Sequence, residues 1–174
     1  MKTLAHFKTI TYHRKLVRQY CFRAGLYYQG LTHDLSKYSP SEFWVGAKYF
    51  QGTRSPNNAE KEDRGYSSSW LHHKGRNKHH YEYWIDYSGK REPVLAGMEM
   101  PVRFVVEAFF DRVAACRTYQ KEAYTNASPW IYYEKGRGFL IMHPTSIAQL
   151  ETLLEVLAKN GEEAAILKAR DMLK

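Results

Sequence analysis

The sequence of 174 residues predicts one domain built almost entirely of helices. Residues 2–28 and about 145–160 repeat apolar side chains at three- and four-residue steps, as amphipathic helices do. Residues 101–123 are apolar around almost the whole helical circumference, which is typical of a central, buried helix. We therefore expect a single all-α domain over residues 1–174, organised as a helical bundle.

The first predicted helix, residues 2–28, carries an apolar stripe. His13 lies on this stripe, three residues from both Ile10 and Leu16, and is therefore expected to point inward. Gly25 and Gly30 mark the end of the helix. A single histidine on an apolar helix face is more often a hydrogen-bonded core residue than a metal ligand, so His13 alone decides nothing.

The second predicted helix follows a start signal. Ser39 is expected to be the N-cap, Pro40 occupies the first helical position, and Glu42 completes a capping box. The helix would continue to Phe50. Residues 51–66 are polar and contain two glycines and a proline, which predicts a surface loop.

A third short helix is expected over residues 67–74, and residues 88–101 are expected to form a loop. Residues 131–142 place two apolar runs around Lys135-Gly136-Arg137-Gly138, a pattern that fits a short β-hairpin.

The C-terminal part is predicted to form two helices. Thr145 or Ser146 would cap the first of them, and Asn160-Gly161 would end it. The last helix is expected over about 162–173.

The buried helix predicted over 101–123 carries two carboxylates. Asp111 lies on its small-residue side, with Glu107 one turn before it. Burying a carboxylate costs several kcal/mol unless a cation or strong donors meet it. The pattern therefore predicts a cation or strong hydrogen-bond donors beside these two side chains.

Composition restricts the partners. The net charge of +8 favours anionic ones, such as phosphorylated small molecules and, less strongly, nucleic acid. The two cysteines, Cys21 and Cys116, offer neither a CxxC motif nor a disulfide framework. No signal peptide and no apolar run of about 20 residues is evident, which predicts a cytoplasmic protein that does not interact with membranes.

Histidine and aspartate occur in four separate places that a helical bundle can bring together. Each place has an ordinary explanation, such as a loop pair, a basic surface loop or a buried partner for an arginine, but their coincidence predicts a metal site. Asp34 could bridge two ions, giving a two-metal site that activates water and holds an oxyanion. The four places are His13, the doublet His33-Asp34, the histidine-rich residues 72–80, and Asp111.

Three segments in order carry a resemblance to a known family: THDLSKYSPSEFW, WLHHKGRNKHHYEYW and EAFFD. The pattern resembles the HD superfamily of metal-dependent phosphohydrolases, whose signature is H…HD…D. More closely, it is similar to a family of small uncharacterised bacterial and phage proteins of HD-like type. The resemblance covers about residues 10–115.

The resemblance implies an HD-like helical fold and a site with one or two divalent ions, of Fe, Mn, Zn, Co or Ni. His72 and His79 stay open as alternatives to their neighbours in the metal set, and the histidine run departs from the spacing of well-studied two-metal phosphodiesterases. Asn77 and Glu82 match positions that support the ligands. The ligands implied are His13, His33, Asp34, His73, His80 and Asp111.

Three functions are compatible with this reading. The first is hydrolysis of a phosphomonoester or phosphodiester, such as a nucleotide, by metal-activated water. Lys37, Arg76 and Lys78 would bind the phosphate, and Glu82 or a cluster histidine would move protons. The second is a diiron HD-like oxygenase, as in myo-inositol oxygenase. The third is a non-enzymatic basic module that binds nucleotide or nucleic acid, in which aromatic residues such as Trp70 and Tyr81 stack on bases.

Overall fold

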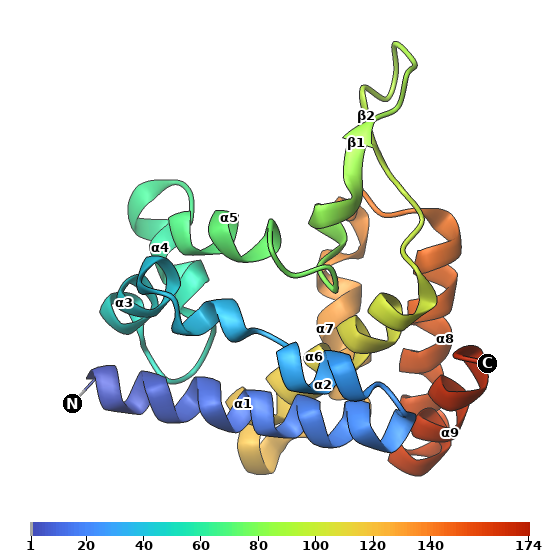
Figure 1. The fold of residues 1–174 in the computed structure, drawn as a ribbon, viewed down its shortest axis with the longest axis horizontal. Coiled ribbons are helices and arrows are strands. Elements are labelled where there is room, and N and C mark those ends of the chain that lie inside the picture. Colours follow the sequence, from blue (N-terminus) through green and yellow to red (C-terminus); the bar gives the residue numbers. More distant parts are fainter. Residues whose placement is uncertain (1) are drawn as a thin grey trace.

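The computed structural model describes residues 2–174, which form nine α-helices and one two-stranded hairpin (Figure 1). The all-α fold class with a short hairpin is thereby confirmed. The hairpin pairs β1 (Ile85–Tyr87) with β2 (Leu95–Gly97) in antiparallel register. The helices are α1 (Lys2–Ala24), α2 (Tyr27–Thr32), α3 (Pro40–Tyr49), α4 (Pro56–Arg64), α5 (Ser68–Lys74), α6 (Val102–Gln120), α7 (Ser128–Gly136), α8 (Pro144–Asn160) and α9 (Glu162–Met172). Four short 3-10 turns connect them: η1 (Leu35–Tyr38), η2 (Tyr81–Trp84), η3 (Lys121–Ala123) and η4 (Arg137–Phe139).

Helix α6 is the centre of the core, as its apolar circumference predicts. It packs against α1 on one side and against α8 on another, and α9 covers both α8 and α1. Phe109 and Phe110 of α6 are buried together with Leu153 and Leu154 of α8. Removing a side chain of this size from water stabilises the fold by roughly 1.5–3 kcal/mol.

Helices α3, α4 and α5 form a second group that packs onto the N-terminal half of α1 through α3 (Figure 1). Two chain segments connect this group to the core: residues 33–38 after α2, and residues 75–84 after α5. Most of the histidines singled out in the sequence lie in or beside these segments. None of the helices described over residues 2–174 is long and apolar enough to cross a membrane.

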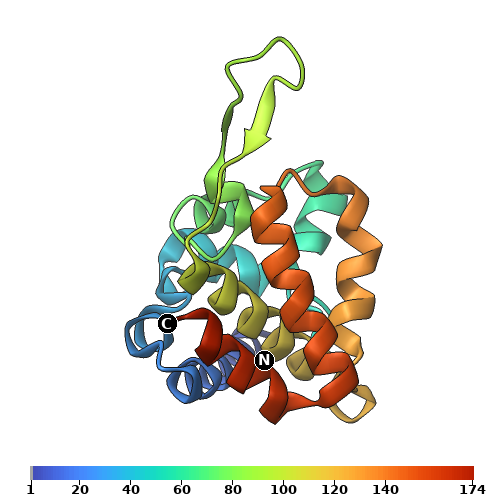
Figure 2. The same ribbon diagram turned by 90° about the vertical axis from the view of Figure 1, so that its right-hand side faces the viewer.

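The hairpin lies at residues 85–97, where it projects beyond the helical body (Figure 2), and not at residues 131–142, where it was predicted. Those residues form α7, η4 and a short connection to α8. Pro129 lies in the first turn of α7, and Tyr133 is buried on the helix face that meets the core. Burial of this face overrides the local turn signal, and the chain continues through Gly136 in helical conformation.

Three other expectations are wrong in detail. Residues 51–66 contain α4, which begins at Pro56 and ends at Arg64; the C-cap residue Gly65 has a φ of 77°, which suits only glycine well. The first predicted helix ends at Ala24, because Gly25 has a φ of 89°, and the short helix α2 follows. Ser39 makes no side-chain cap hydrogen bond within residues 2–174.

Glu60 explains why a segment as polar as residues 56–64 forms a helix that packs against the rest of the protein. Its side chain is fully buried, although the segment has the composition of a loop. The carboxylate accepts hydrogen bonds from the hydroxyls of Ser67, Ser68 and Ser69 and from the backbone N–H of Ser68. Burial alone would raise the pKa of Glu60, but these hydrogen bonds lower it to about 2. The carboxylate therefore joins α4 to the start of α5.

We expect Glu60→Gln to destabilise the protein by about 1–3 kcal/mol, because a buried amide cannot accept all of these hydrogen bonds. The folded-state pKa of Glu60 lies below its ordinary value of 4.5. Its contribution is therefore complete above that value and is lost as the pH falls towards 2. Urea unfolding at pH 7 and pH 3 measures both effects.

Glu62→Gln is the matched control for this prediction. Glu62 lies on the same helix but is exposed and pairs only with Arg54. If Glu60→Gln proves no less stable than Glu62→Gln at pH 7, the structural role of Glu60 is wrong.

Candidate metal centre

Eight histidine and acidic side chains from separate parts of the chain converge between the two helix groups. They come from α1, from the segment after α2, from the end of α5 and the residues that follow it, and from α6. The side chains are His13, His33, Asp34, His73, His79, His80, Glu107 and Asp111.

Asp34 is the centre of this group, and the local backbone explains how two neighbouring residues reach it. Helix α2 ends at Thr32, and Asp34 adopts a left-handed conformation with φ 54° and ψ 25°. In a continuous helix the side chains of His33 and Asp34 would point about 100° apart. The break lets both point inward, and aspartate tolerates the left-handed region better than most residues. Both side chains are buried.

One ligand set lies around Asp34 Oδ2. His13 Nε2 is 3.6 Å from this oxygen and His33 Nε2 is 3.3 Å from it. Asp111 Oδ1 completes the set, 2.9 Å from His13 Nε2 and 3.5 Å from His33 Nε2. All four ligand atoms lie within 4.8 Å of one another.

A second ligand set lies around the other oxygen of the same carboxylate. His73 Nε2 is 3.2 Å from Asp34 Oδ1, and His79 Nε2 is 3.4 Å from it. His80 joins these residues, and again each residue offers a ligand atom within 4.8 Å of the others. Asp34 therefore faces two sets at once, with one oxygen in each.

The facing atoms of these sets are not paired by hydrogen bonds. The Nε2 atoms of all five histidines are buried and lack a hydrogen-bond partner anywhere in residues 2–174. Buried polar atoms are nearly always satisfied, so five such nitrogens around one carboxylate indicate a missing partner. Imidazole nitrogens combined with carboxylate oxygens are ligands that Zn, Mn, Fe, Co and Ni accept. The residues present therefore fit a metal centre with two positions.

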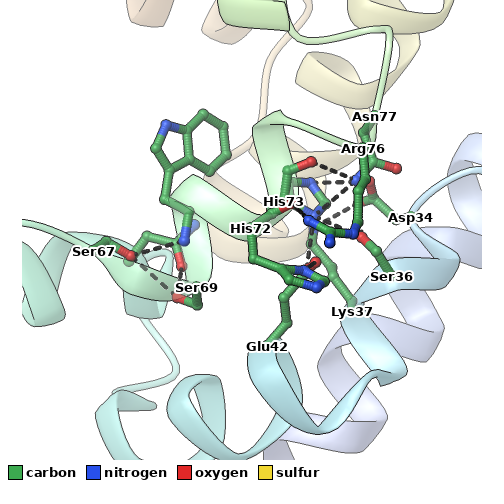
Figure 3. A network of polar contacts seen from close by, with 12 residues as sticks. Asp34, Ser36, Lys37, Glu42, Ser67, Ser69, His72, His73, Arg76 and Asn77 are labelled. Atoms are coloured by element: carbon green, nitrogen blue, oxygen red, sulfur yellow. Dashed lines mark hydrogen bonds and ion pairs between the residues drawn. The ribbon is translucent and has the colours of Figure 1, made fainter.

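The opposite ring nitrogens are held by two further carboxylates. His33 Nδ1 donates to Glu107 Oε1 at 2.9 Å, and His79 Nδ1 lies 3.1 Å from the same oxygen. His73 Nδ1 donates to Glu42 Oε2 at 2.8 Å, and His72 Nδ1 to Glu42 Oε1 at 2.6 Å (Figure 3). Ligand histidines in metal sites typically donate their second N–H in this way.

These contacts determine which ring nitrogen is free. Burial would raise the pKa values of Glu42 and Glu107, but hydrogen bonds from the histidines lower both. Each glutamate is therefore ionised and can only accept, so the Nδ1 atoms must carry hydrogen. A neutral ring in this tautomer presents its Nε2 lone pair to the centre, as a metal ligand must.

The cluster carries more negative charge than its permanent cation balances. Four carboxylates are present, and Lys37 is the one lysine or arginine in the described chain that forms an ion pair with any of them, 2.6 Å from Asp34 Oδ2. Burial opposes ionisation of Asp34, but His33 and Lys37 beside it hold its pKa well below the usual range. Burial likewise opposes the charge on His33, yet Asp34 and Asp111 raise its pKa well above normal. Protons or metal ions must supply the remaining positive charge.

The structure brings together all six side chains that the sequence resemblance implies as ligands: His13, His33, Asp34, His73, His80 and Asp111. Lys37 lies beside them and forms an ion pair with Asp34. The side-chain amide of Asn77 donates to the carbonyl oxygen of His73 at 2.8 Å.

Three predicted residues do not join the centre. Arg76 is exposed and donates to the carbonyl oxygen of His72. Lys78 is exposed and lies over the ring of Tyr83. Glu82 is half-buried in η2 and has no hydrogen bond or ion pair within residues 2–174. The residues between α5 and η2 form no regular helix or strand, so their spacing in the sequence does not predict which side chains reach the centre, and these three do not.

Sequence reasoning left His79 open and missed the roles of Glu42 and Glu107. His79 is almost fully buried, and its ring centroid lies 4.4 Å from that of His33 and 4.1 Å from that of His80. Glu42 was expected to complete a capping box with Ser39, but it reaches the histidines of α5 instead. Glu107 was recognisable only as a buried carboxylate one turn before Asp111.

Comparison with known proteins identifies one family. The sequence profile of a family of unknown function, DUF5662, matches residues 2–156. No curated protein and no solved structure matches the chain.

The two supporting carboxylates should have different effects on metal binding. Glu107→Gln should weaken binding at both positions by about 10–100-fold, because Glu107 orients one histidine of each set. Glu42→Gln should weaken only the position that His73 serves. Competition titrations of Mn²⁺ and Zn²⁺ against a chelating dye measure the two affinities.

Glu155→Gln, an exposed change on α8, is the control for these titrations. Unchanged affinity at both positions in a folded Glu107→Gln protein would contradict the geometry derived above.

Proposed function

The chain belongs to DUF5662, a family of unknown function, and we propose that it is a metal-dependent phosphohydrolase acting on phosphomonoesters or phosphodiesters. One observation carries the proposal: two sets of buried, unpaired ligand atoms share the carboxylate of Asp34. The order of the ligands along the chain, with HDLSK at residues 33–37, adds the resemblance to the HD superfamily.

Two divalent ions held about one carboxylate supply chemistry suited to phosphate esters. When bound, they lower the pKa of a water molecule towards neutrality and offset the charge of a phosphoryl group. His13, His33, Asp34 and Asp111 would hold one ion, and Asp34, His73, His79 and His80 the other. Glu42 and Glu107 keep the imidazoles oriented, so that the ligands need little rearrangement when the ions bind.

Lys37 is proposed to bind the phosphate. Its side chain is 28% exposed and that of Asp111 is 21% exposed, whereas those of His33 and Asp34 are closed off from solvent. A substrate therefore reaches the centre from the side of Lys37 and Asp111. A lysine ammonium is a strong donor to phosphate oxygens. Arg76, Lys78 and Glu82 lie away from the ligand sets and receive no role.

The proposed substrate is an anionic, phosphorylated small molecule such as a nucleotide. The net charge of +8 favours the approach of such anions to the protein. Tyr81 packs against the hydrophobic core, and the ring of Trp70 lies 4.6 Å from that of His80, so binding of nucleic acid through these rings is the weaker alternative.

The first test measures metal content and hydrolysis together. Protein purified without chelator or nickel resin should carry up to two ions per chain and release nitrophenol from 4-nitrophenyl phosphate or its diester. Asp34→Asn should lose both properties while remaining folded, because the bridging carboxylate belongs to both sets. Asp171→Asn is the control, since Asp171 is exposed and pairs only with Lys174.

Other outcomes of this test favour the alternatives. Redox-coloured iron without phosphate release would support an HD-like oxygenase. A protein that binds no metal but binds nucleic acid in a salt-dependent manner would support the binding module. Unchanged metal content and turnover in Asp34→Asn would contradict the proposed hydrolase.

A second test concerns Lys37. Lys37→Gln should retain both ions, because the lysine ligates neither, and should raise KM for the phosphate ester at least tenfold, which corresponds to about 1.4 kcal/mol. Steady-state kinetics with matched metal analysis measures this effect. Lys48→Gln, an exposed change on α3, should behave as the unaltered protein. If Lys37→Gln leaves KM unchanged, Lys37 does not bind the phosphate.

A further inference from the structure

A cleft of about 520 Å³ lies outside the ligand sets, between α1 and the end of α6. Lys8 and Tyr12 of α1 line one side of it. Arg117 and Thr118 of α6 line the other, and η3 and the residue after it close the end. A volume of this size is typical of pockets that bind small molecules.

The cleft is positively charged. Lys8, Arg117 and Lys121 line it, against the single carboxylate of Glu122. Arg117 is already paired with Glu162 at 2.6 Å. Lys8 and Lys121 form no ion pair within residues 2–174, so two ammonium groups are available to a ligand. The first acidic residue of the whole sequence is Asp34, so α1 contributes no compensating charge.

Two of the residues that line the cleft, Arg117 and Tyr124, also carry hydrogen-bond donors. Tyr124 Oη and Arg117 Nε are buried and have no hydrogen-bond partner in the part of the chain that the structure describes. Arg117 lies over the ring of Tyr124, 4.6 Å from its centroid, so the two groups are held together. Burial raises the pKa of Tyr124, and its hydroxyl therefore stays protonated and can donate. The guanidinium of Arg117 and the hydroxyl of Tyr124 are donors, so the ligand chemistry that suits this side of the cleft is a hydrogen-bond acceptor such as a phosphate.

The backbone is strained at the same place. Lys121 has φ 51° and ψ −117°, a combination that non-glycine residues rarely adopt. Among residues 2–174, Lys121 and Asp34 are the two non-glycine residues with positive φ. Such conformations are strained and cluster at functional sites. One of the two lies in the metal centre, and the other lies in this cleft.

We propose that this cleft is a second binding site, which holds a phosphate group of a phosphorylated small molecule through Lys8, Lys121, Arg117 and Tyr124. The site is distinct from the ligand sets and needs no metal. The cleft lies close to the ligand sets along both helices. On α1, Thr9 of the cleft precedes His13 by one helical turn. On α6, Thr118 of the cleft follows Asp111 by seven residues, or about 10 Å of helix. The occupant is therefore either the distal phosphate of a substrate or a separate phosphorylated effector.

Binding of pyrophosphate and of AMP to the full-length protein, measured by calorimetry in EDTA, tests this site. Lys8→Gln combined with Lys121→Gln should weaken binding at least tenfold, and Tyr124→Phe should weaken it by a smaller factor. Lys90→Gln combined with Lys135→Gln removes the same charge from exposed positions elsewhere and should leave binding unchanged. Asp34→Asn should also leave binding unchanged.

Two results would overturn the proposal. The first is a Lys8/Lys121 variant that binds the probes as tightly as the unaltered protein. The second is binding that disappears in EDTA or in Asp34→Asn, which would place the probe at the metal centre instead.

Kinetics with the metal-loaded protein then distinguishes a substrate's distal phosphate from a separate effector. A raised KM in the Lys8/Lys121 variant identifies the distal phosphate of the substrate. An unchanged KM, with turnover that responds to added AMP only when both lysines are present, identifies an effector.

Discussion

The carboxylate of Asp34 is fully buried, and side chains from several parts of the domain compensate for the unfavourable free energy of burying it. An ionised carboxylate without compensation in a protein interior costs several kcal/mol. Helix α1 and the segments after α2 and α5 each direct one or more histidines toward this one side chain, whereas Asp111 of α6 adds a second carboxylate. Lys37 supplies one permanent positive charge, and protons or metal ions supply the rest.

The same constraint joins the two helix groups. Glu42 of α3 accepts hydrogen bonds from the histidines of α5, and Glu107 of α6 contacts histidines that follow α2 and α5. The candidate metal centre is therefore also the polar junction between the core, formed by α1, α6, α8 and α9, and the group formed by α3, α4 and α5.

The sequence predicted those parts of the fold and site that depend on local pattern. The apolar periodicity of α1, α6 and α8 is local, and the doublet His33-Asp34 with His13 and Asp111 follows a spacing that can be recognised. Other features depend on tertiary contacts. The polar segment of α4 folds as a helix because Glu60 meets three serines, and residues 131–142 become helical because Tyr133 packs on the core. Glu42 matched a capping motif, and only the position of α5 shows that histidines compete for it.

The central claim is that one buried carboxylate bridges two metal ions. Electron paramagnetic resonance of the protein loaded with Mn²⁺ tests this claim most directly, because two manganese ions joined by a single carboxylate are magnetically coupled. We expect the multiline spectrum of an exchange-coupled pair at two equivalents of Mn²⁺, and its loss in Asp34→Asn. A six-line spectrum of isolated ions at every loading, or no tightly bound manganese at all, would contradict the claim.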